Sequence, residues 1–341
     1  MSDRKAPRSG VVAAVEALLA AQDQVSAGEV ARAARVTRQA AHYHLRRLVD
    51  AGVLRRVGAG RGSRYVRAVE LHRTYGLAGL REDEVWDEVS GDVAAIGDMR
   101  PNVAKTLRFA FTEMLNNAID HSAGTEAVVT AATEPRFSFR IVDDGVGAFR
   151  HLASRLGLED DVAAAFELMK GKRTAAPGEH SGQGIFFTSR LVDRFGLEAN
   201  AIRLTVDNDL GDFAIGDSTV RLGTTVWWEV DPMSTRDATE IFRGFTDAES
   251  LEFTRTVIPL RVLGGPSFIS RAEARRVTDQ LERFEEAVLD FSGVDDVGQG
   301  FVDELFRVWA VRHPETRLVP VSMSPAVERM IRSVAPRSPS S

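Results

Sequence analysis

The chain has 341 residues, of which 44% are hydrophobic and 27% are charged, so a folded protein of two or three domains is expected. It contains no cysteine, which excludes disulfide bonds and metal sites built on thiolates. No apolar run approaches the ~20 residues of a membrane span, and the first residues lack the apolar region of a signal peptide. We therefore expect a cytoplasmic protein.

Charge is unevenly distributed along the chain, whose net charge is −6. Residues 1–75 carry 14 lysines and arginines against 6 aspartates and glutamates, a balance of +8, so the remainder carries −14. A basic segment on an acidic protein favours contact of that segment alone with a polyanion.

The basic segment shows the pattern of three helices followed by a hairpin. Apolar residues recur at helical spacing over residues 11–19. Ser26 and Thr37 can cap a second and a third helix. Residues 53–57 and 63–67 then predict two strands joined by a glycine-rich turn.

This order of elements resembles a winged helix-turn-helix of bacterial regulators, which implies that the third helix enters the major groove of DNA. Four polar residues of that helix lie opposite its apolar face and would contact bases or phosphates: Arg38, Gln39, His42 and Arg46. On the hairpin, Arg61 and Arg64 would contact phosphates or the minor groove. Winged helices also serve as protein-interaction modules, but the positive charge favours duplex DNA.

Residues 101–121 predict an amphipathic helix that carries functional groups on its polar face. Glu113, Asn117 and Asp120 fall together there at i, i+4 and i+7. Asn117 offers the neutral oxygen donor that a magnesium ion held against a triphosphate needs. Glu113, one turn earlier, could orient or deprotonate an attacking water or hydroxyl. Glu113 is therefore the candidate catalytic residue, and Asn117 is the candidate magnesium ligand.

Two glycine-containing motifs follow this helix. Asp143-Asp-Gly145-Val-Gly147 comes after an apolar strand predicted over residues 137–142. His180-Ser-Gly182-Gln-Gly184 comes directly before another predicted helix. Neither a Walker lysine motif nor a Rossmann glycine pattern is present. A polar helix, an Asp-Gly turn and a glycine-rich loop in this order predict an ATP site.

The three motifs resemble the N, G1 and G2 boxes of the GHKL superfamily of ATPases and kinases, to which gyrase, Hsp90, histidine kinases and MutL belong. The resemblance implies a central α/β sandwich with the Bergerat ATP fold, which binds ATP and Mg²⁺. Asp143 would accept a hydrogen bond from the adenine amine, and Gly145 and Gly147 would let the backbone approach the base. Asp120 joins the ATP-binding set through the first motif.

Further residues complete the site that the resemblance implies. Backbone amides near Gly182 and Gly184 would face the phosphates. Thr224 lies in a Gly-Thr-Thr sequence that resembles the last box and would complete the adenine pocket. Residues 156–184 resemble the ATP lid. Three residues could supply positive charge there, and the sequence does not choose between them: Lys170, Lys172 and Arg173.

Beyond residue 232, predicted strands and helices alternate. We expect strands at 255–262, 286–291 and 318–321, and helices at 270–284, 300–309 and 326–334. This order resembles STAS domains, the antagonist partners of anti-sigma-factor kinases. Such antagonists carry a phospho-accepting serine at a strand-to-helix turn, whereas the matching residues 298–301 here are Gly-Gln-Gly-Phe. We therefore expect this domain to dock rather than to accept phosphate.

The sequence thus predicts a multidomain α+β protein. Its expected parts are a winged helix-turn-helix DNA-binding domain over residues 1–75, a GHKL ATP-binding domain over 76–232, and a STAS-like βαβ domain over 233–341 that ends in a disordered tail. Besides duplex DNA and ATP, the expected partners are a protein that docks on the STAS-like domain and a second copy of the chain in a homodimer. No membrane contact is expected.

The leading hypothesis is a bacterial transcriptional or signalling regulator whose GHKL domain binds and hydrolyses Mg·ATP to control DNA binding or partner docking. One alternative is an anti-sigma-type serine/threonine kinase that phosphorylates an antagonist in a partner switch. Another is a nucleotide-binding scaffold without turnover. A histidine kinase is disfavoured, because no dimerisation hairpin with a phospho-accepting histidine precedes the ATP module.

Overall fold

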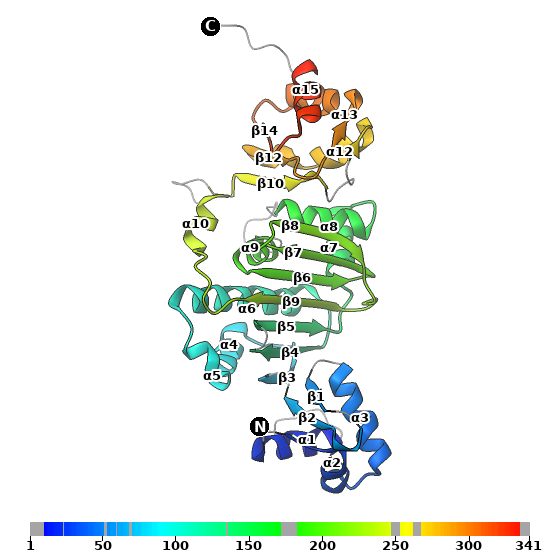
Figure 1. The fold of residues 1–341 in the computed structure, drawn as a ribbon. Coiled ribbons are helices and arrows are strands. Elements are labelled where there is room, and N and C mark those ends of the chain that lie inside the picture. Colours follow the sequence, from blue (N-terminus) through cyan, green and yellow to red (C-terminus); the bar gives the residue numbers. More distant parts are fainter. Residues whose placement is uncertain are drawn as a thin grey trace.

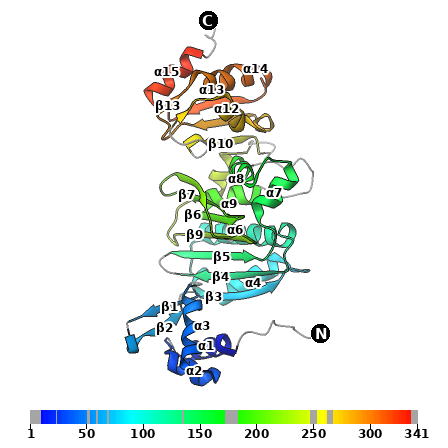
Figure 2. The same ribbon diagram turned by 90° about the vertical axis from the view of Figure 1, so that its right-hand side faces the viewer.

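The computed structural model describes nine stretches of the chain: residues 10–22, 24–50, 53–58, 60–67, 70–133, 136–171, 183–246, 253–261 and 267–334. They form an N-terminal helical domain, a central sheet covered by helices, and a C-terminal α/β domain. The N-terminal and C-terminal domains lie at opposite ends of an elongated arrangement (Figures 1 and 2). Within these stretches, no helix has the length and apolarity to cross a bilayer.

The N-terminal domain consists of three helices and a two-stranded hairpin, as predicted. Its elements are α1 (Gly10–Ala21), α2 (Ala27–Ala34), α3 (Arg38–Asp50), β1 (Leu54–Val57) and β2 (Arg64–Arg67). Ser26 and Glu29 form a reciprocal capping box at the start of α2. The Thr37 hydroxyl accepts a hydrogen bond from the Ala40 amide at 3.2 Å and so caps α3. Buried side chains such as Val30 and Leu45 give this domain its own hydrophobic core.

The central domain is built on a seven-stranded antiparallel sheet in the order β3-β4-β5-β9-β6-β7-β8. The strands are β3 (Leu71–Gly76), β4 (Glu126–Ala132), β5 (Phe137–Asp143), β6 (Arg194–Ala199), β7 (Ile202–Asp207), β8 (Asp212–Asp217) and β9 (Thr224–Val230). The helices are α4 (Glu82–Asp92), α5 (Ala94–Gly97), α6 (Pro101–His121), α7 (Ala148–Leu156), α8 (Asp161–Lys170) and α9 (Gln183–Leu191). In Figure 1, the C-terminal domain lies beyond the β8 edge of the sheet and the N-terminal domain beyond the β3 edge.

The long helix α6 confirms the amphipathic helix predicted over residues 101–121. Pro101 occupies its first turn, where a missing amide hydrogen costs nothing. Its apolar stripe, which includes Leu107 and Phe111, is buried against the sheet, and the Phe111 ring centroid lies 5.2 Å from that of Phe139 on β5. The polar side chains Glu113, Asn117 and Asp120 are not among the buried residues of α6.

Two sequence-based expectations about the central domain need revision. The segment 156–184, predicted as one long lid, contains the helix α8, which packs into the core through Ala164, Ala165 and Leu168. Residues 172–182 lie outside the described stretches. Strand β3 crosses the predicted boundary at residue 75 and pairs with β4, so we now propose that the central domain begins near residue 70.

The C-terminal domain contains a parallel sheet in the order β10-β12-β14 and a small parallel pair, β11 and β13. The strands are β10 (Arg255–Pro259), β11 (Ser267–Phe268), β12 (Glu286–Asp290), β13 (Asp296–Val297) and β14 (Arg317–Val321). The helices are α10 (Ala238–Arg243), α12 (Arg271–Thr278), α13 (Gln299–Asp303), a π-helical stretch (Glu304–Trp309), α14 (Ala310–Arg312) and α15 (Pro325–Val334). The predicted alternation of strands and helices is confirmed.

Details of this domain differ from the prediction. The helix expected over 270–284 ends at Thr278, because Gln280 adopts a left-handed conformation with φ of 60° and a 3₁₀ turn, Leu281–Arg283, follows. Helix α10 and the short strands β11 and β13 were not predicted. The tail expected to be disordered falls on residues 335–341, outside the described stretches.

The indole of Trp228 lies at the centre of the central sheet, in β9 between β5 and β6, and is fully buried. We expect Trp228→Ala to lower the free energy of unfolding by about 3–5 kcal/mol, because it leaves a large cavity. The neighbouring Trp227 points to the other face of the sheet and is half-buried, so Trp227→Ala should cost clearly less. Urea denaturation followed by circular dichroism compares the two variants, and equal losses would contradict this account of the core.

Candidate functional site

A cavity of about 70 Å³ lies between α6, α7 and α9 and the strands β5, β6 and β9. Most of its lining is apolar and includes Met114, Ile141 and Ile185. The polar lining comes from separate parts of the sequence, namely Asn117, His121, Ser122, Asp143, His151 and Thr224. An apolar cavity with a few convergent polar groups is typical of a small-molecule site. Three of the predicted ATP-binding residues therefore meet here.

Asp143 ends β5 with its carboxylate buried at the cavity, where it is 8% exposed. Its Oδ1 accepts hydrogen bonds from the amides of Gly145 at 2.9 Å and Thr224 at 3.1 Å. Burial raises the pKa of this carboxyl, and the hydrogen bonds from Gly145 and Thr224 oppose that rise. Both amides donate to the same carboxylate oxygen and so fix the orientation of the group.

The adjacent Asp144 has a different task. Its carboxylate accepts hydrogen bonds from the hydroxyl of Thr125 at 2.6 Å, and from the amides of Thr125 and Glu126 at 2.6 and 3.0 Å. These bonds lower the pKa of Asp144 to about 2. Asp144 therefore closes the turn before β4, while Asp143 alone faces the cavity.

The glycines of the Asp-Gly motif are required by contacts inside the protein. A Cβ on Gly145 would lie 2.0 Å from the carbonyl oxygen of Ser122, and one on Gly147 would lie 2.4 Å from Asn200. Gly223 has φ of +69°, and a Cβ there would lie 2.0 Å from the carbonyl oxygen of Asp143. The sequence analysis predicted that these glycines let the backbone approach an adenine base. The structure gives a second reason for them, which is the close packing of the backbone around Asp143.

Thr224 links two walls of the cavity. Its hydroxyl oxygen accepts a hydrogen bond from the amide of Ala148, the first residue of α7, at 3.1 Å. Its own amide donates to Asp143, as described above. The side chain is buried, so Thr224 holds the start of α7 beside the carboxylate.

Asn117 projects from α6 into the cavity with a defined amide orientation. Its Nδ2 donates a hydrogen bond to the carbonyl oxygen of Glu113 at 2.8 Å. Because Nδ2 is bound to the helix backbone, Oδ1 points the other way from that carbonyl oxygen. A neutral oxygen donor of this kind fits magnesium held by nucleotide phosphates. Across the described residues, no cluster of three or more acidic or histidine side chains could hold a metal ion without a nucleotide.

Glu113 lies one turn before Asn117, against the start of α9. A Cβ added to Gly184 would come 2.0 Å from Oε2 of Glu113, so any larger residue at 184 would displace the carboxylate. The structure therefore places the candidate catalytic residue beside the first turn of α9, which carries Gly184 of the predicted phosphate loop. Asp120, by contrast, is exposed and does not line the cavity. Gly182 lies outside the described residues.

The structure excludes Lys170 as the source of positive charge at the phosphates. Its ammonium group is 3% exposed and makes an ion pair with Glu167 at 2.7 Å. It also donates hydrogen bonds to the carbonyl oxygens of Arg276 and Asp279 in the C-terminal domain. Its three protons thus have partners within the protein. The two remaining candidates, Lys172 and Arg173, lie outside the described residues.

Two histidines in the cavity wall were missed by the sequence analysis. The rings of His121 and His151 stack with centroids 5.6 Å apart, and both line the cavity. Burial lowers the pKa of each imidazole. The available signal was the spacing of four residues between Asn117 and His121, which places both side chains on one face of α6.

The predicted DNA-binding residues form an exposed surface on the N-terminal domain. Arg38, Gln39, His42 and Arg46 of α3 are all exposed, as is Arg64 of β2. The side chain of Arg61 lies outside what the structure describes. The Tyr65 hydroxyl and the His42 Nδ1 share a hydrogen bond of 3.3 Å, which ties the imidazole to the hairpin.

Two further residues extend this surface. Tyr43 is 60% exposed, and the guanidinium of Arg47 lies 5.9 Å from the centre of its ring. Both follow Gln39 at intervals of four residues, a spacing that could have identified them. In the hairpin, Arg56 donates two hydrogen bonds to the Ser63 hydroxyl, at 3.0 and 2.7 Å, which fix the base of the turn.

Comparison with protein-family models matches three parts of the chain. Residues 9–57 match a helix-turn-helix domain, residues 81–206 a histidine kinase-like ATPase domain, and residues 273–328 a STAS-like domain of unknown function. A search of curated proteins found no match. A solved structure described as the topoisomerase IV ATP binding domain of Francisella tularensis, in complex with a small-molecule inhibitor, is 13% identical with a TM-score of 0.24. That match covers 52% of this chain and 48% of the other, about half the length of each.

The order of these matches agrees with the order of the three structural units. The matched ranges contain the exposed α3 surface, the lining of the cavity except for Thr224 and Val226, and the strands β12 and β14, respectively. The chain therefore combines a helix-turn-helix domain, a histidine kinase-like ATPase domain of the GHKL type and a STAS-like domain, an architecture that supports a DNA-binding regulator with an ATP-binding domain.

Proposed function

We propose that this protein is a regulator whose central domain binds Mg·ATP and whose N-terminal domain binds duplex DNA. The observation that carries the proposal is the Asp143 carboxylate, buried at an apolar cavity and oriented by the amides of Gly145 and Thr224. A carboxylate held in this way offers an acceptor to the amine of adenine, and guanine has no amine at the corresponding position. The apolar walls of the cavity suit the faces of a purine ring.

Asn117 and Glu113 support binding and turnover, respectively. Asn117 would hold the magnesium ion, which neutralises phosphate charge when bound. Glu113 is a half-buried carboxylate beside Gly184, where it would orient or deprotonate the group that attacks the terminal phosphate. The nucleotide would then bias DNA binding or partner docking only through different affinities for two states of the protein.

A serine/threonine kinase is the second candidate, and it makes the same demand on Glu113. At the turn where STAS antagonists carry their acceptor serine, this chain has Gly298, whose amide donates to the carbonyl oxygen of Phe268 at 2.6 Å. The nearby Ser292 hydroxyl donates to Asp290 at 2.8 Å. The acceptor would therefore belong to another protein. Incubation with labelled ATP, followed by separation of free phosphate from labelled protein, distinguishes hydrolysis from phosphotransfer. If neither labelled phosphate nor labelled protein forms, the hypothesis of a nucleotide-binding scaffold without turnover is favoured.

We expect Asp143→Ala to weaken ATP binding by about tenfold or more, because it removes a hydrogen bond to a charged acceptor. Asp144→Ala is the matched control. It removes the neighbouring carboxylate, which faces away from the cavity, and should leave ATP affinity within a few-fold. Calorimetric titration of both folded variants measures the difference. Unchanged affinity in Asp143→Ala would overturn the adenine assignment.

The same carboxylate predicts how ATP affinity depends on pH. Asp143 must be ionised to accept the adenine amine, and burial raises its pKa. Affinity should therefore fall on acidification from a higher pH than an exposed aspartate would cause. The ATP affinity of Asp143→Ala, measured over the same pH range, should lack the pH dependence that protonation of Asp143 causes.

We expect Glu113→Gln to bind ATP within a few-fold of the wild type while losing turnover or phosphotransfer by roughly 100-fold, the range typical of a general base. The amide keeps the size of the side chain but cannot take a proton. Glu126→Gln, which alters an exposed carboxylate on β4, is the control. Phosphate release and protein labelling are the measurements, and normal turnover in Glu113→Gln would remove this residue from the mechanism.

DNA binding by the full chain should weaken steeply with salt, because phosphate contacts release counterions. Arg38→Ala or Gln39→Ala should cost about 1–3 kcal/mol at a preferred sequence and reduce its preference over others. Arg221→Ala removes one exposed arginine from the central domain and should have no effect. Fluorescence anisotropy with a library-selected duplex measures these changes. Failure of the wild-type chain to bind any duplex at low salt would make the N-terminal domain a protein-docking module.

A further inference from the structure

Helix α9 belongs to two domains at once. Its first turn lies in the candidate ATP site, where Gly184 packs against Glu113 and Ile185 lines the cavity. The next two residues, Phe186 and Phe187, are 1% and 5% exposed and belong to the hydrophobic core of the C-terminal domain. The nucleotide site and the C-terminal domain therefore share one rigid element.

The contact between α9 and the C-terminal domain is a cluster of aromatic rings. Phe253, two residues before the start of β10, lies 5.0 Å from Phe186 and 5.4 Å from Phe187 between ring centroids. Residues 231–246, which include α10, form the segment that joins the two domains. In this joining segment, Phe242 lies 4.4 Å from Phe187, and Phe245 lies 5.0 Å from Phe186. Separation of the domains would expose this whole cluster to water, which is strongly unfavourable.

The end of α8 is bound to the same domain through buried polar contacts. The Thr256 hydroxyl, on β10, donates a hydrogen bond to the carbonyl oxygen of Lys170 at 2.7 Å, and Thr256 is fully buried. The Lys170 ammonium donates to the carbonyl oxygens of Arg276 and Asp279 at 3.2 and 2.9 Å. Both hydrogen bonds cross from α8 to the C-terminal domain and would be lost if the domains moved apart.

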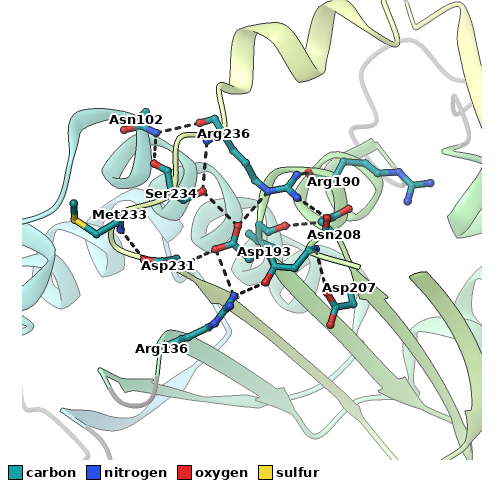
Figure 3. A network of polar contacts seen from close by, with 12 residues as sticks. Asn102, Arg136, Arg190, Asp193, Asp207, Asn208, Asp231, Met233, Ser234 and Arg236 are labelled. Atoms are coloured by element: carbon teal, nitrogen blue, oxygen red, sulfur yellow. Dashed lines mark hydrogen bonds and ion pairs between the residues drawn. The ribbon is translucent and has the colours of Figure 1, made fainter. Parts of the chain in front are cut away.

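A polar network holds the other end of α9 (Figure 3). Arg236, in the joining segment, makes an ion pair with Asp193 at 3.1 Å and donates to the carbonyl oxygen of Asn208 at 2.8 Å. The side-chain amide of Asn208 donates to the carbonyl oxygens of Ser189 and Val192, each at 2.7 Å. The last turn of α9 is thus fixed to the joining segment and to the loop between β7 and β8.

We propose that the C-terminal domain positions the ATP site in cis, because it holds α9 where Gly184 and Ile185 meet Glu113 and the cavity. The proposal rests on ATP binding at that cavity, as argued above. Its positioning residues are Thr256 and Phe253, which contact α8 and α9 and do not line the cavity. By thermodynamic linkage, bound ATP must in turn stabilise the contact between the C-terminal domain and α9.

The test uses full-length variants that weaken this contact from the C-terminal side. Thr256→Val removes the hydroxyl that binds the Lys170 carbonyl, and Phe253→Leu removes the ring between Phe186 and Phe187. Thr316→Val is the matched control. Thr316 is a buried threonine of the same domain whose hydroxyl donates to the carbonyl oxygen of Phe284 at 2.7 Å and not to α8 or α9. Thermal melts show whether each variant is folded, and they allow variants with similar losses of stability to be compared.

We expect Thr256→Val and Phe253→Leu to bind Mg·ATP about five- to tenfold more weakly, chiefly through faster dissociation, and Thr316→Val to bind within twofold of the wild type. In the wild type, Mg·ATP should slow amide hydrogen exchange in β10, a readout that remains even if a variant fails to fold. The proposal would be overturned if both variants bound Mg·ATP as tightly as the wild type or more tightly, and if ATP did not change the rate of hydrogen exchange in β10. If the wild-type chain itself binds no ATP, the proposed function fails instead.

Discussion

The burial of α9 on all sides constrains the rest of the molecule. Each of its residues from Gly184 to Leu191 is buried, including Arg190. The Arg190 guanidinium lies 4.1 Å from the ring centre of Phe213 and 5.0 Å from that of Phe186, and burial lowers its pKa to about 9. A nine-residue helix with no exposed face cannot shift without disturbing the central sheet, the joining segment or the C-terminal core. Its first turn is therefore held in the candidate ATP site by contacts that lie well outside that site.

The end of the candidate site at Asp143 is rigid for a different reason. Asp143 receives main-chain amides from two segments that are distant in sequence, and Gly145 and Gly223 bring those segments into van der Waals contact around it. The Gly223 amide also donates to the carbonyl oxygen of Gly145 at 2.8 Å. The carboxylate is thus oriented before any ligand arrives, which reduces the entropy lost on binding. One end of the candidate site is thus formed by rigid backbone around Asp143. The other end is formed by α9, which is shared with the C-terminal domain.

Local pattern predicted most of the elements, and the resemblance to the GHKL motifs singled out three residues that line the cavity: Asn117, Asp143 and Thr224. The apolar stripe of α6, the caps at Ser26 and Thr37, and the strands of the C-terminal sheet follow from periodicity and capping alone. Contacts between domains could not be predicted in this way. Phe186 and Phe187 look like ordinary core residues in the sequence, since periodicity shows that a face is buried but not which core receives it.

The same limit explains the residues whose roles changed or were missed. Lys170 was a candidate for the phosphates because it lies near the glycine-rich loop in sequence, yet a neighbouring carboxylate and two carbonyl groups of another domain bind it. His151, on α7, lies beside His121, on α6, only in the folded structure. Such partners are set by tertiary structure, which a single sequence does not encode in any local signal.

The three hydrophobic cores suggest how a signal could travel along the molecule. The core of the N-terminal domain draws its described residues from α1–α3 and the hairpin alone, whereas the C-terminal core includes α9 of the central domain. The N-terminal domain is followed directly by β3, the edge strand of the sheet, whose Leu71 belongs to the central core. In the central sheet, β3 is the strand that follows the N-terminal domain, whereas α9 belongs to the core of the C-terminal domain itself. The proposal that ATP binds at the cavity therefore implies that the C-terminal domain responds to nucleotide more directly than the N-terminal domain does.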